Sequence, residues 1–189
     1  MTTSRSLTAG LTAVFLGLVF SQSLPAATAY SLLPDGDFDK PDAKGDWPLG
    51  WSKAGSGATW ETEDNNRFIR LTSLAPGRHI KLFETARIPA GTPGFDLSMR
   101  VRVRGLRPGE QQWYNARVII NFVTADGKRT ASRQFPQFSR DTDGWQSVNQ
   151  QIAVPPDAVA IEFMPSLFKV AAGTMDLDDI ILTPVPAGL

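Results

Sequence analysis

The ten residues 95–104, Phe-Asp-Leu-Ser-Met-Arg-Val-Arg-Val-Arg, alternate between apolar and polar side chains without a break. Successive side chains of a β-strand point to opposite faces of its sheet, so a period of two predicts a strand. One face of this strand carries Phe, Leu, Met and two Val, and the other carries three Arg. The stretch therefore predicts a strand with one buried face and one solvated, cationic face.

The rest of the chain continues the all-β pattern. Residues 115–124 are more continuously apolar, which is typical of a central strand. Asp126-Gly127 predicts a type I′ hairpin turn over residues 125–128, because this pair accepts the positive φ angles of that turn. Turn signals recur roughly every ten residues, and no long helical period is present, which predicts a sandwich or barrel. Further strands are expected at residues 67–72, 78–83, 128–135, 146–154, 158–164 and 174–183.

Residues 1–29 have the features of a secretory signal peptide. Arg5 supplies the positive start, residues 7–20 are uncharged and mostly apolar, and Ala27-Thr28-Ala29 is a cleavage signal. The apolar run is short and interrupted by Gly and Thr, whereas a membrane span needs about 20 residues. We therefore expect cleavage after Ala29 and export to the periplasm or the medium, with an N-terminal membrane anchor as the alternative.

The chain after the leader suits one domain with a substantial core. We expect this domain to cover residues 30–183, to be monomeric, and to have no membrane segment, because no second long apolar run follows. Residues 184–189 are expected to form a short tail, because their prolines lack the amide donors that a strand ladder uses.

Charge and cysteine content exclude several classes of function. The 189 residues hold 19 basic and 19 acidic side chains, and removal of the leader leaves a net charge of −1. Nucleic acid and anionic membranes favour a basic patch, so neither is expected as a partner. The chain has no cysteine, which excludes disulfides, thiol catalysis and cysteine-ligated metal, and exported proteins without cysteine are typical of bacteria.

Several short motifs follow one another in a specific order. Gly-Asp-Phe-Asp at 36–39 and Trp-Pro-Leu-Gly-Trp at 47–51 come first, and an aromatic-led segment at 113–117 leads to the Gly hairpin at 126–128. Gly144-Trp145, Val154-Pro155 and the terminal segment at 173–182, which contains Asp178-Asp179, follow. In this order the motifs resemble the CenC-like group of carbohydrate-binding modules, which are accessory domains of extracellular glycoside hydrolases.

The resemblance implies a fold and a function. The fold is a galactose-binding-domain-like jelly-roll β-sandwich of two antiparallel sheets. The function is non-catalytic binding of a polysaccharide or oligosaccharide in a shallow, aromatic-lined cleft on one sheet. The resemblance covers nearly all of the chain after the leader, so we expect the module without an attached catalytic domain.

A structural calcium ion between the first and last strands is also implied by the resemblance. Its candidate ligands are Asp37, Asp39, Asp178 and Asp179. Acidic oxygens at the two ends of one sheet suit a hard cation that binds six to eight oxygens, including backbone carbonyls. Asp178 and Asp179 point opposite ways on a strand, so only one is expected to bind. The alternative is a pair of charged strand ends without an ion.

Aromatic side chains are the candidate platforms for a sugar ring, whose apolar C–H face stacks on a flat surface. Trp113 and Tyr114 lead the central strand, and Trp60 is a second candidate, stacking from an adjoining strand. Adjacent strand residues point to opposite faces, so at most one of Trp113 and Tyr114 is expected in the cleft unless the loop bends. The alternative for each ring is a place in the core, where Trp51 and Trp145 are expected to close the sandwich edges.

Polar side chains near these aromatics are candidate edge contacts for sugar hydroxyls. Asn115, Arg117 and Asn121 share one face of the expected central strand, and Gln137 follows in the returning strand. Guanidinium and amide groups suit vicinal hydroxyls. The alternative is ordinary solvation of an exposed face.

Two rival functions use the same fold. A structural or adhesion module would bind a protein partner through an exposed aromatic patch. A small glycoside hydrolase would need two carboxylates about 5–10 Å apart in a cleft. His79 is the single histidine, no Gly-x-Ser-x-Gly motif accompanies it, and we expect it to be an ordinary strand residue. The carboxylates considered for hydrolysis are Glu61, Glu84, Glu110 and Glu162.

Overall fold

A computed structural model describes residues 30–186, and the expected signal peptide lies outside these residues. The described chain contains ten strands and no helix, hence no helix suited to crossing a membrane. Five strands form a first sheet in the order β1-β2-β10-β5-β8, and the second sheet has the order β3-β9-β6-β7, with β4 also paired to β9. The strands are β1 Ala58–Glu63, β2 Asn66–Thr72, β3 His79–Lys81, β4 Glu84–Arg87, β5 Gly94–Arg107, β6 Ala116–Val123, β7 Arg129–Phe138, β8 Gln146–Ala153, β9 Ala160–Phe168 and β10 Ala172–Pro184.

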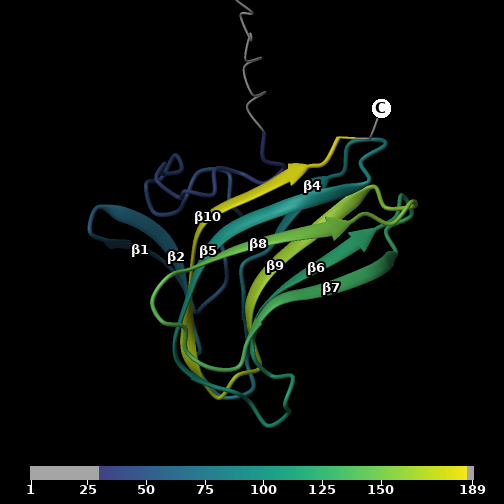
Figure 1. Ribbon diagram of the computed structural model, residues 1–189. Coiled ribbons are helices and arrows are strands. Elements are labelled where there is room, and N and C mark those ends of the chain that lie inside the picture. Colours follow the sequence, from purple (N-terminus) through teal and green to yellow (C-terminus); the bar gives the residue numbers. More distant parts are fainter. Residues whose placement is uncertain (1–29, 187–189) are drawn as a thin grey trace, which may run out of the picture.

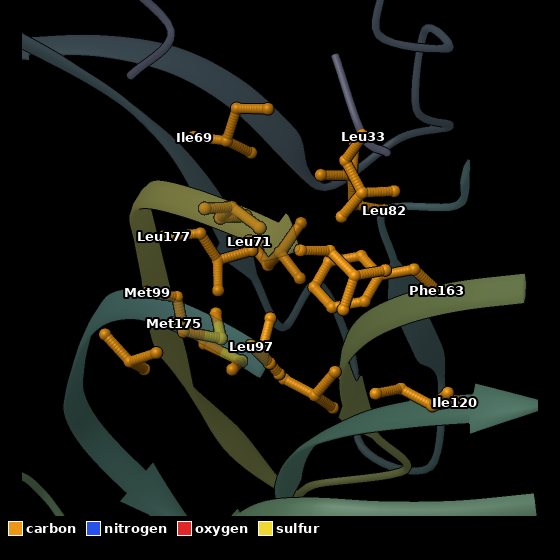
Figure 2. Close-up of a cluster of buried hydrophobic side chains, with 14 of the residues drawn as sticks. Leu33, Ile69, Leu71, Leu82, Leu97, Met99, Ile120, Phe163, Met175 and Leu177 are labelled. Carbon is orange, nitrogen blue, oxygen red and sulfur yellow. The ribbon is translucent and has the colours of Figure 1, made fainter. Parts of the chain in front are cut away.

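The two antiparallel sheets pack face to face, as Figure 1 shows for β10, β5 and β8 above β9, β6 and β7. The alternation that predicted β5 decides its buried face, because every apolar side chain of residues 95–104 is buried. Leu97 and Met99 lie with Leu177 on the first sheet and meet Ile120 and Phe163 of the second (Figure 2). The predicted all-β jelly-roll sandwich is confirmed.

The N-terminal segment lies against the last strand, as the motifs at the two chain ends predicted. The amide of Ile180 donates to the carbonyl of Gly36 at 3.0 Å. Phe38 is buried and its ring centroid lies 5.0 Å from that of Trp51. Trp51 is buried and its Nε1 donates to the carbonyl of Asp35 at 2.9 Å, so its predicted place in the core is confirmed.

The hairpin turns differ from the prediction. A type I′ turn needs positive φ at both central residues, and at the predicted position only Gly127 has it. Thr124 and Lys128 close this turn, because the Thr124 amide donates to the Lys128 carbonyl at 2.9 Å. Asp64 and Asn65 between β1 and β2 both have positive φ, 52° and 64°, so the I′-type backbone lies there.

The strand boundaries also differ from the prediction. Strand β1 was not expected. The expected strand at 78–83 is shortened to β3, and β4, which follows it at Glu84–Arg87, was not expected either. Strand β10 continues to Pro184, which lies opposite Phe95, and the amide of Val185 donates to Gly94 at 2.9 Å. The backbone pairing therefore continues two residues past the predicted strand end at 183, because a proline removes only one donor and the next residue restores the pairing.

Candidate functional site

The outer face of the second sheet, called here the β6 face, carries most of the predicted polar residues. Alternation along β6 buries Val118 and Ile120 in the core and turns Arg117 and Asn121 to the other side of the sheet. On the neighbouring strand β9, Ser166 lies opposite Arg117. The shared face that the sequence predicted for Arg117 and Asn121 is confirmed.

Four rings form an aromatic cluster at one end of the β6 face, made of Trp113, Tyr114, Phe168 and His79. The ring centroids of Trp113 and Tyr114 are 6.0 Å apart, those of Tyr114 and Phe168 are 5.7 Å apart, and those of His79 and Phe168 are 4.9 Å apart. Each pair is edge to face, a favourable arrangement for aromatic rings. Trp113 is 58% exposed and His79 is also exposed, whereas Tyr114 and Phe168 are half-buried, so the two exposed rings lie at the ends of the cluster and the two half-buried rings lie between them.

The loop before β6 holds the Trp113 and Tyr114 pair in place. The amide of Gly109 donates to the carbonyl of Tyr114 at 2.9 Å, and the amide of Tyr114 donates to Gln111 at 2.8 Å. A Cβ at position 109 would lie 2.2 Å from the carbonyl oxygen of Lys169. Because only glycine allows this close approach, Gly109 lets the loop fold back onto the segment after β9. This bend keeps both rings in one cluster, which strict strand geometry would not.

A polar network lies beside the aromatic cluster. Arg117 Nε donates to Asn115 Oδ1 at 2.7 Å, and Arg117 Nη1 donates to Gln134 Oε1. Asn115 Nδ2 donates to Gln137 Oε1 at 3.3 Å. The guanidinium carbon of Arg117 lies 5.0 Å from the ring centroid of Phe168. Burial lowers the pKa of Arg117, which is 3% exposed, so the guanidinium at the centre of this network is largely desolvated.

Asn121 belongs to a second polar group further along β6. Its Nδ2 donates to Glu162 Oε2 at 2.8 Å, and Arg129 Nε donates to the same oxygen at 2.9 Å. Asn121 is 5% exposed, whereas Gln137 in the first network is exposed. The predicted polar row therefore consists of buried members on β6 and accessible members on the edge strand β7.

Trp60 is not at this site. It lies on β1, which pairs only with β2 at the edge of the first sheet. Its Nε1 donates to the carbonyl of Phe38 at 3.0 Å, and the guanidinium carbon of Arg67 lies 4.0 Å from its ring centroid. The expectation that Trp60 stacks from a strand adjoining the central one is wrong, because β1 and β6 belong to different sheets.

Phe168 and Lys169 are parts of the site that the sequence analysis missed. The predicted strand ended at residue 164, but β9 continues to Phe168. The signal was present as continued alternation, since Met164, Ser166 and Phe168 face outward while Leu167 is in the core. Lys169 follows with a φ of 53°, and its Nζ lies 5.2 Å from the Tyr114 ring centroid.

The four predicted calcium ligands lie in adjoining segments, but the side chains of Asp37, Asp178 and Asp179 have other partners. Asp178 is fully buried and accepts hydrogen bonds from Asn66 at 2.9 Å and Arg100 at 3.0 Å. Burial raises the pKa of Asp178, and the hydrogen bond from Asn66 opposes this. Asp179 lies 3.3 Å from Arg100, and Asp37 accepts the amide of Asp39 at 3.1 Å.

The fit to a calcium ion is therefore partial. Residues 30–186 contain no group of three or more His, Cys, Asp or Glu side chains arranged to hold a metal. The two segments do meet, because the Gly36 carbonyl accepts a hydrogen bond from the Ile180 amide at 3.0 Å. A dication there would have to compete with the guanidinium of Arg100.

The outer face of the first sheet carries an ion-pair network with one tryptophan over it. Trp145 lies edge to face with Phe68, at a centroid distance of 5.5 Å, and 4.5 Å from the guanidinium carbon of Arg102. Asp176 is fully buried and lies 2.6 Å from Arg70 and 2.8 Å from Arg102. The predicted place of Trp145 in the core is wrong, because its ring covers charged side chains outside the sandwich.

The four carboxylates considered for hydrolysis are spread over the molecule. Glu61 lies on β1 of the first sheet, and Glu110 is in the loop before β6. Glu84 and Glu162 are on neighbouring strands of the second sheet but point to opposite faces, because Glu84 pairs with Phe163 in the register. The described fold does not bring two of these four carboxylates to a common cleft.

The sandwich matches solved structures, although no protein-family profile and no curated protein sequence matches the chain. TmCBM61 in complex with β-1,4-galactotriose matches at a TM-score of 0.55 and 9% identity, over 83% of this chain and 100% of that one. The CBM22-1 xylan-binding domain of Paenibacillus barcinonensis Xyn10C matches at a TM-score of 0.54 and 13% identity, over 86% and 100%.

The enzymatically active domain of tailspike protein 4 from bacteriophage CBA120 also matches, at a TM-score of 0.56 and 12% identity. The match covers 82% of this chain and spans only 21% of the tailspike chain. Because the sequence identities are this low, the matches show the fold of the protein and nothing further. The protein is a β-sandwich of the architecture that carbohydrate-binding modules share.

Proposed function

We propose that this protein binds polysaccharide without cleaving it, and that the β6 face with its aromatic cluster is the binding surface. The observation that carries the proposal is Trp113, a 58% exposed indole supported edge-on by Tyr114 beside a fixed polar network. An exposed indole offers a flat apolar surface on which the C–H face of a sugar ring can stack. The shared architecture with carbohydrate-binding modules supports the proposal.

In this proposal the exposed polar residues contact the ligand, and the buried polar residues position their neighbours. Gln137 on the edge strand is exposed and suits hydrogen bonds to sugar hydroxyls. Arg117 and Asn121 are nearly inaccessible, so they hold Asn115, Gln134 and Glu162 in place rather than reach the ligand first. Because an exposed face holds its ligand from one side, we expect weak to moderate affinity.

The finer assignments rest on the sequence motifs. We propose that the protein belongs with the CenC-like group, that residues 1–29 direct its export, and that the mature domain acts as a monomer. A calcium ion near Asp178 is a further proposal.

The experiment compares polysaccharide binding by the wild-type domain and Trp113→Ala. Loss of one stacking ring costs about 1–3 kcal/mol in comparable base–aromatic contacts, so affinity should fall about five- to 150-fold. The melting temperature should stay constant, because the ring is mostly exposed. Trp60→Phe is the control, because it replaces an indole by a smaller ring on the other sheet. Unchanged affinity of Trp113→Ala for every polysaccharide that the wild type binds would contradict the site.

A further inference from the structure

Arg117 is a buried cation without an acidic partner. Two of its nitrogens donate to the neutral side-chain oxygens of Asn115 and Gln134, and its Nη2 is buried with no hydrogen-bond partner. Within residues 30–186, no carboxylate oxygen lies within 4.0 Å of its guanidinium, whereas the buried Arg102 is paired with Asp176 and Glu63. Buried charges are normally paired, so the missing counter-charge at Arg117 points to a ligand.

More cations gather around the same aromatic cluster. Burial lowers the pKa of His79, and the positive charges of Lys81, Arg117 and Lys169 lower it further. Neither lysine has a carboxylate oxygen within 4.0 Å in the described part of the chain. Glu110 is exposed and lines a small pocket with Lys169, but it too forms no ion pair at that distance.

A surface cavity of about 350 Å³ adjoins the cluster at the edge strand β3. It is lined on one side by Arg78, His79 and Lys81 and on the other by the loop from Ser52 to Ser56, with no acidic residue in its lining. The remaining cation of the lining, Lys53, is paired with Asp46 at 2.7 Å. Arg78 and Lys81 are exposed, so their charges are available to a bound molecule.

Glu162 also lies on the β6 face, but it does not neutralise the positive charge at the end of this face that carries the aromatic cluster. Glu162 pairs in register with Asn121, and Ser166 pairs with Arg117. Four residues along a strand separate the two positions by about 13 Å, at roughly 3.3 Å per residue. That separation exceeds the screening length of about 8 Å at physiological salt, and Glu162 is already paired with Arg129 at 2.9 Å.

We propose that the polysaccharide is anionic, with carboxylate or sulfate-ester groups that contact Lys81, Lys169 and Arg78 while a sugar ring stacks on Trp113. Arg117 is buried beneath this surface and does not contact the ligand. Its positive charge attracts the anionic groups through its electric field. Uronates and sulfate esters offer the same negative oxygens, which suit ammonium and guanidinium donors. This inference rests on the proposed function and names the substrate class of that site.

The test uses pairs of polymers that differ in charge alone. Binding of the wild-type domain is measured calorimetrically with polygalacturonate and its carboxyl-reduced form, and with dextran sulfate and dextran, at 20 mM and 200 mM salt. We expect binding to one or both charged polymers, weakening at the higher salt, and weaker or no binding to their neutral counterparts. The two charged polymers distinguish a uronate site from a sulfate-ester site.

Charge-removing variants locate the contact. Lys81→Gln and Lys169→Gln should each reduce affinity for the bound charged polymer about two- to fivefold, the usual effect of one exposed ion pair. The matched control is Lys128→Gln, which removes the same charge from the 81% exposed side chain at the distant β6–β7 turn. Its affinity should equal that of the wild type.

Each contrary outcome has a distinct meaning. Equal binding to a charged polymer and its neutral counterpart would overturn the anionic ligand and leave the proposed polysaccharide function standing. Equal losses in Lys81→Gln and Lys128→Gln would show non-specific attraction and overturn the site. No binding to these polymers, together with binding to neutral galactan or xylan, would also overturn the inference, whereas no binding to any polysaccharide would overturn the proposed function itself.

Discussion

Gly36 and Ile180 join the N-terminal segment to the last strand at a distance that no side chain at position 36 allows. The Ile180 amide donates to the Gly36 carbonyl at 3.0 Å, and a Cβ on Gly36 would lie 2.0 Å from the Ile180 oxygen. Because the obstructing atom is backbone, the clash cannot be relieved by a rotamer change.

Gly36→Ala should therefore destabilise the domain by about 1–3 kcal/mol, the usual cost of overpacking a filled site. Urea denaturation gives this free energy. Gly55→Ala is the matched control, because its Cβ meets nothing within 4 Å and its φ is not in the positive range. A stability loss in Gly55→Ala as large as in Gly36→Ala would contradict the argument from close approach.

Asp176 holds the outer face of the first sheet together. Asp176→Asn should cost about 3–5 kcal/mol, because it leaves Arg70 and Arg102 beside each other without their buried counter-charge. Glu63→Gln should cost about 0–1 kcal/mol, because Glu63 is 44% exposed and its pair with Arg102 is at the rim. Thermal unfolding of both variants measures the difference, and similar losses in the two would show that burial does not set the strength of this network.

A bound calcium ion should make the stability of the domain depend on chelator. An ion at a hundredfold excess over its dissociation constant adds about 2.7 kcal/mol to the folded state. If the ion binds near Asp178, calcium should raise the melting temperature of the chelator-treated domain, and Asp178→Asn should remove that response. Identical melting curves with and without calcium, after verified metal removal, would show that Arg100 and Asn66 alone satisfy Asp178.

Trp60→Ala should separate stability from binding. Trp60 is half-buried and donates to the Phe38 carbonyl at 3.0 Å, so its loss should cost about 1–3 kcal/mol of stability. Because β1 belongs to the other sheet, polysaccharide affinity should not change. A fall in affinity without a fall in stability would contradict this prediction and show that Trp60 is part of the binding site.

Binding of an anionic polysaccharide should strengthen as the pH falls. The pKa of His79 lies below its usual 6.5, because of burial and of Lys81, Arg117 and Lys169. A bound anion raises that pKa, so the complex takes up a proton, and affinity should increase from pH 8 to about pH 5, above the titration of a typical carboxyl. His79→Gln should bind with little dependence on pH over this range, and a pH dependence equal to that of the wild type would exclude His79 as its source.

The fold was largely predictable from sequence because it depends on a local pattern. The alternation of residues 95–104 assigned the buried face of β5 correctly, and the continuous apolar run at 115–124 identified the central strand β6. Errors arose where a single residue was given too much weight. Pro184 still pairs with Phe95 as the last residue of β10, and the Val185 amide beyond it donates to Gly94. Asp126-Gly127 does not form a type I′ turn, because only Gly127 has a positive φ.

The candidate site was predictable only in part. Strand parity placed Arg117 and Asn121 on one face of β6, and the exposed Trp113 beside them was identified as a candidate platform. The order of the strands was not encoded in any local pattern, so the sequence could not show that Trp60 lies in the other sheet. The extension of β9 to Phe168 was also missed, although alternation continued there.

By itself, then, the sequence determined which apolar side chains of the long strands are buried and which side chains share a strand face, because both follow from the period of two along an extended chain. The tertiary structure alone decided which strands are neighbours, and it thereby brought Lys81, Phe168 and Arg117 together from β3, β9 and β6. That assembly depends on long-range pairing, in which residues separated by tens of positions meet. The positive charge around the aromatic cluster is therefore a property of the fold, in a chain with no excess of basic residues.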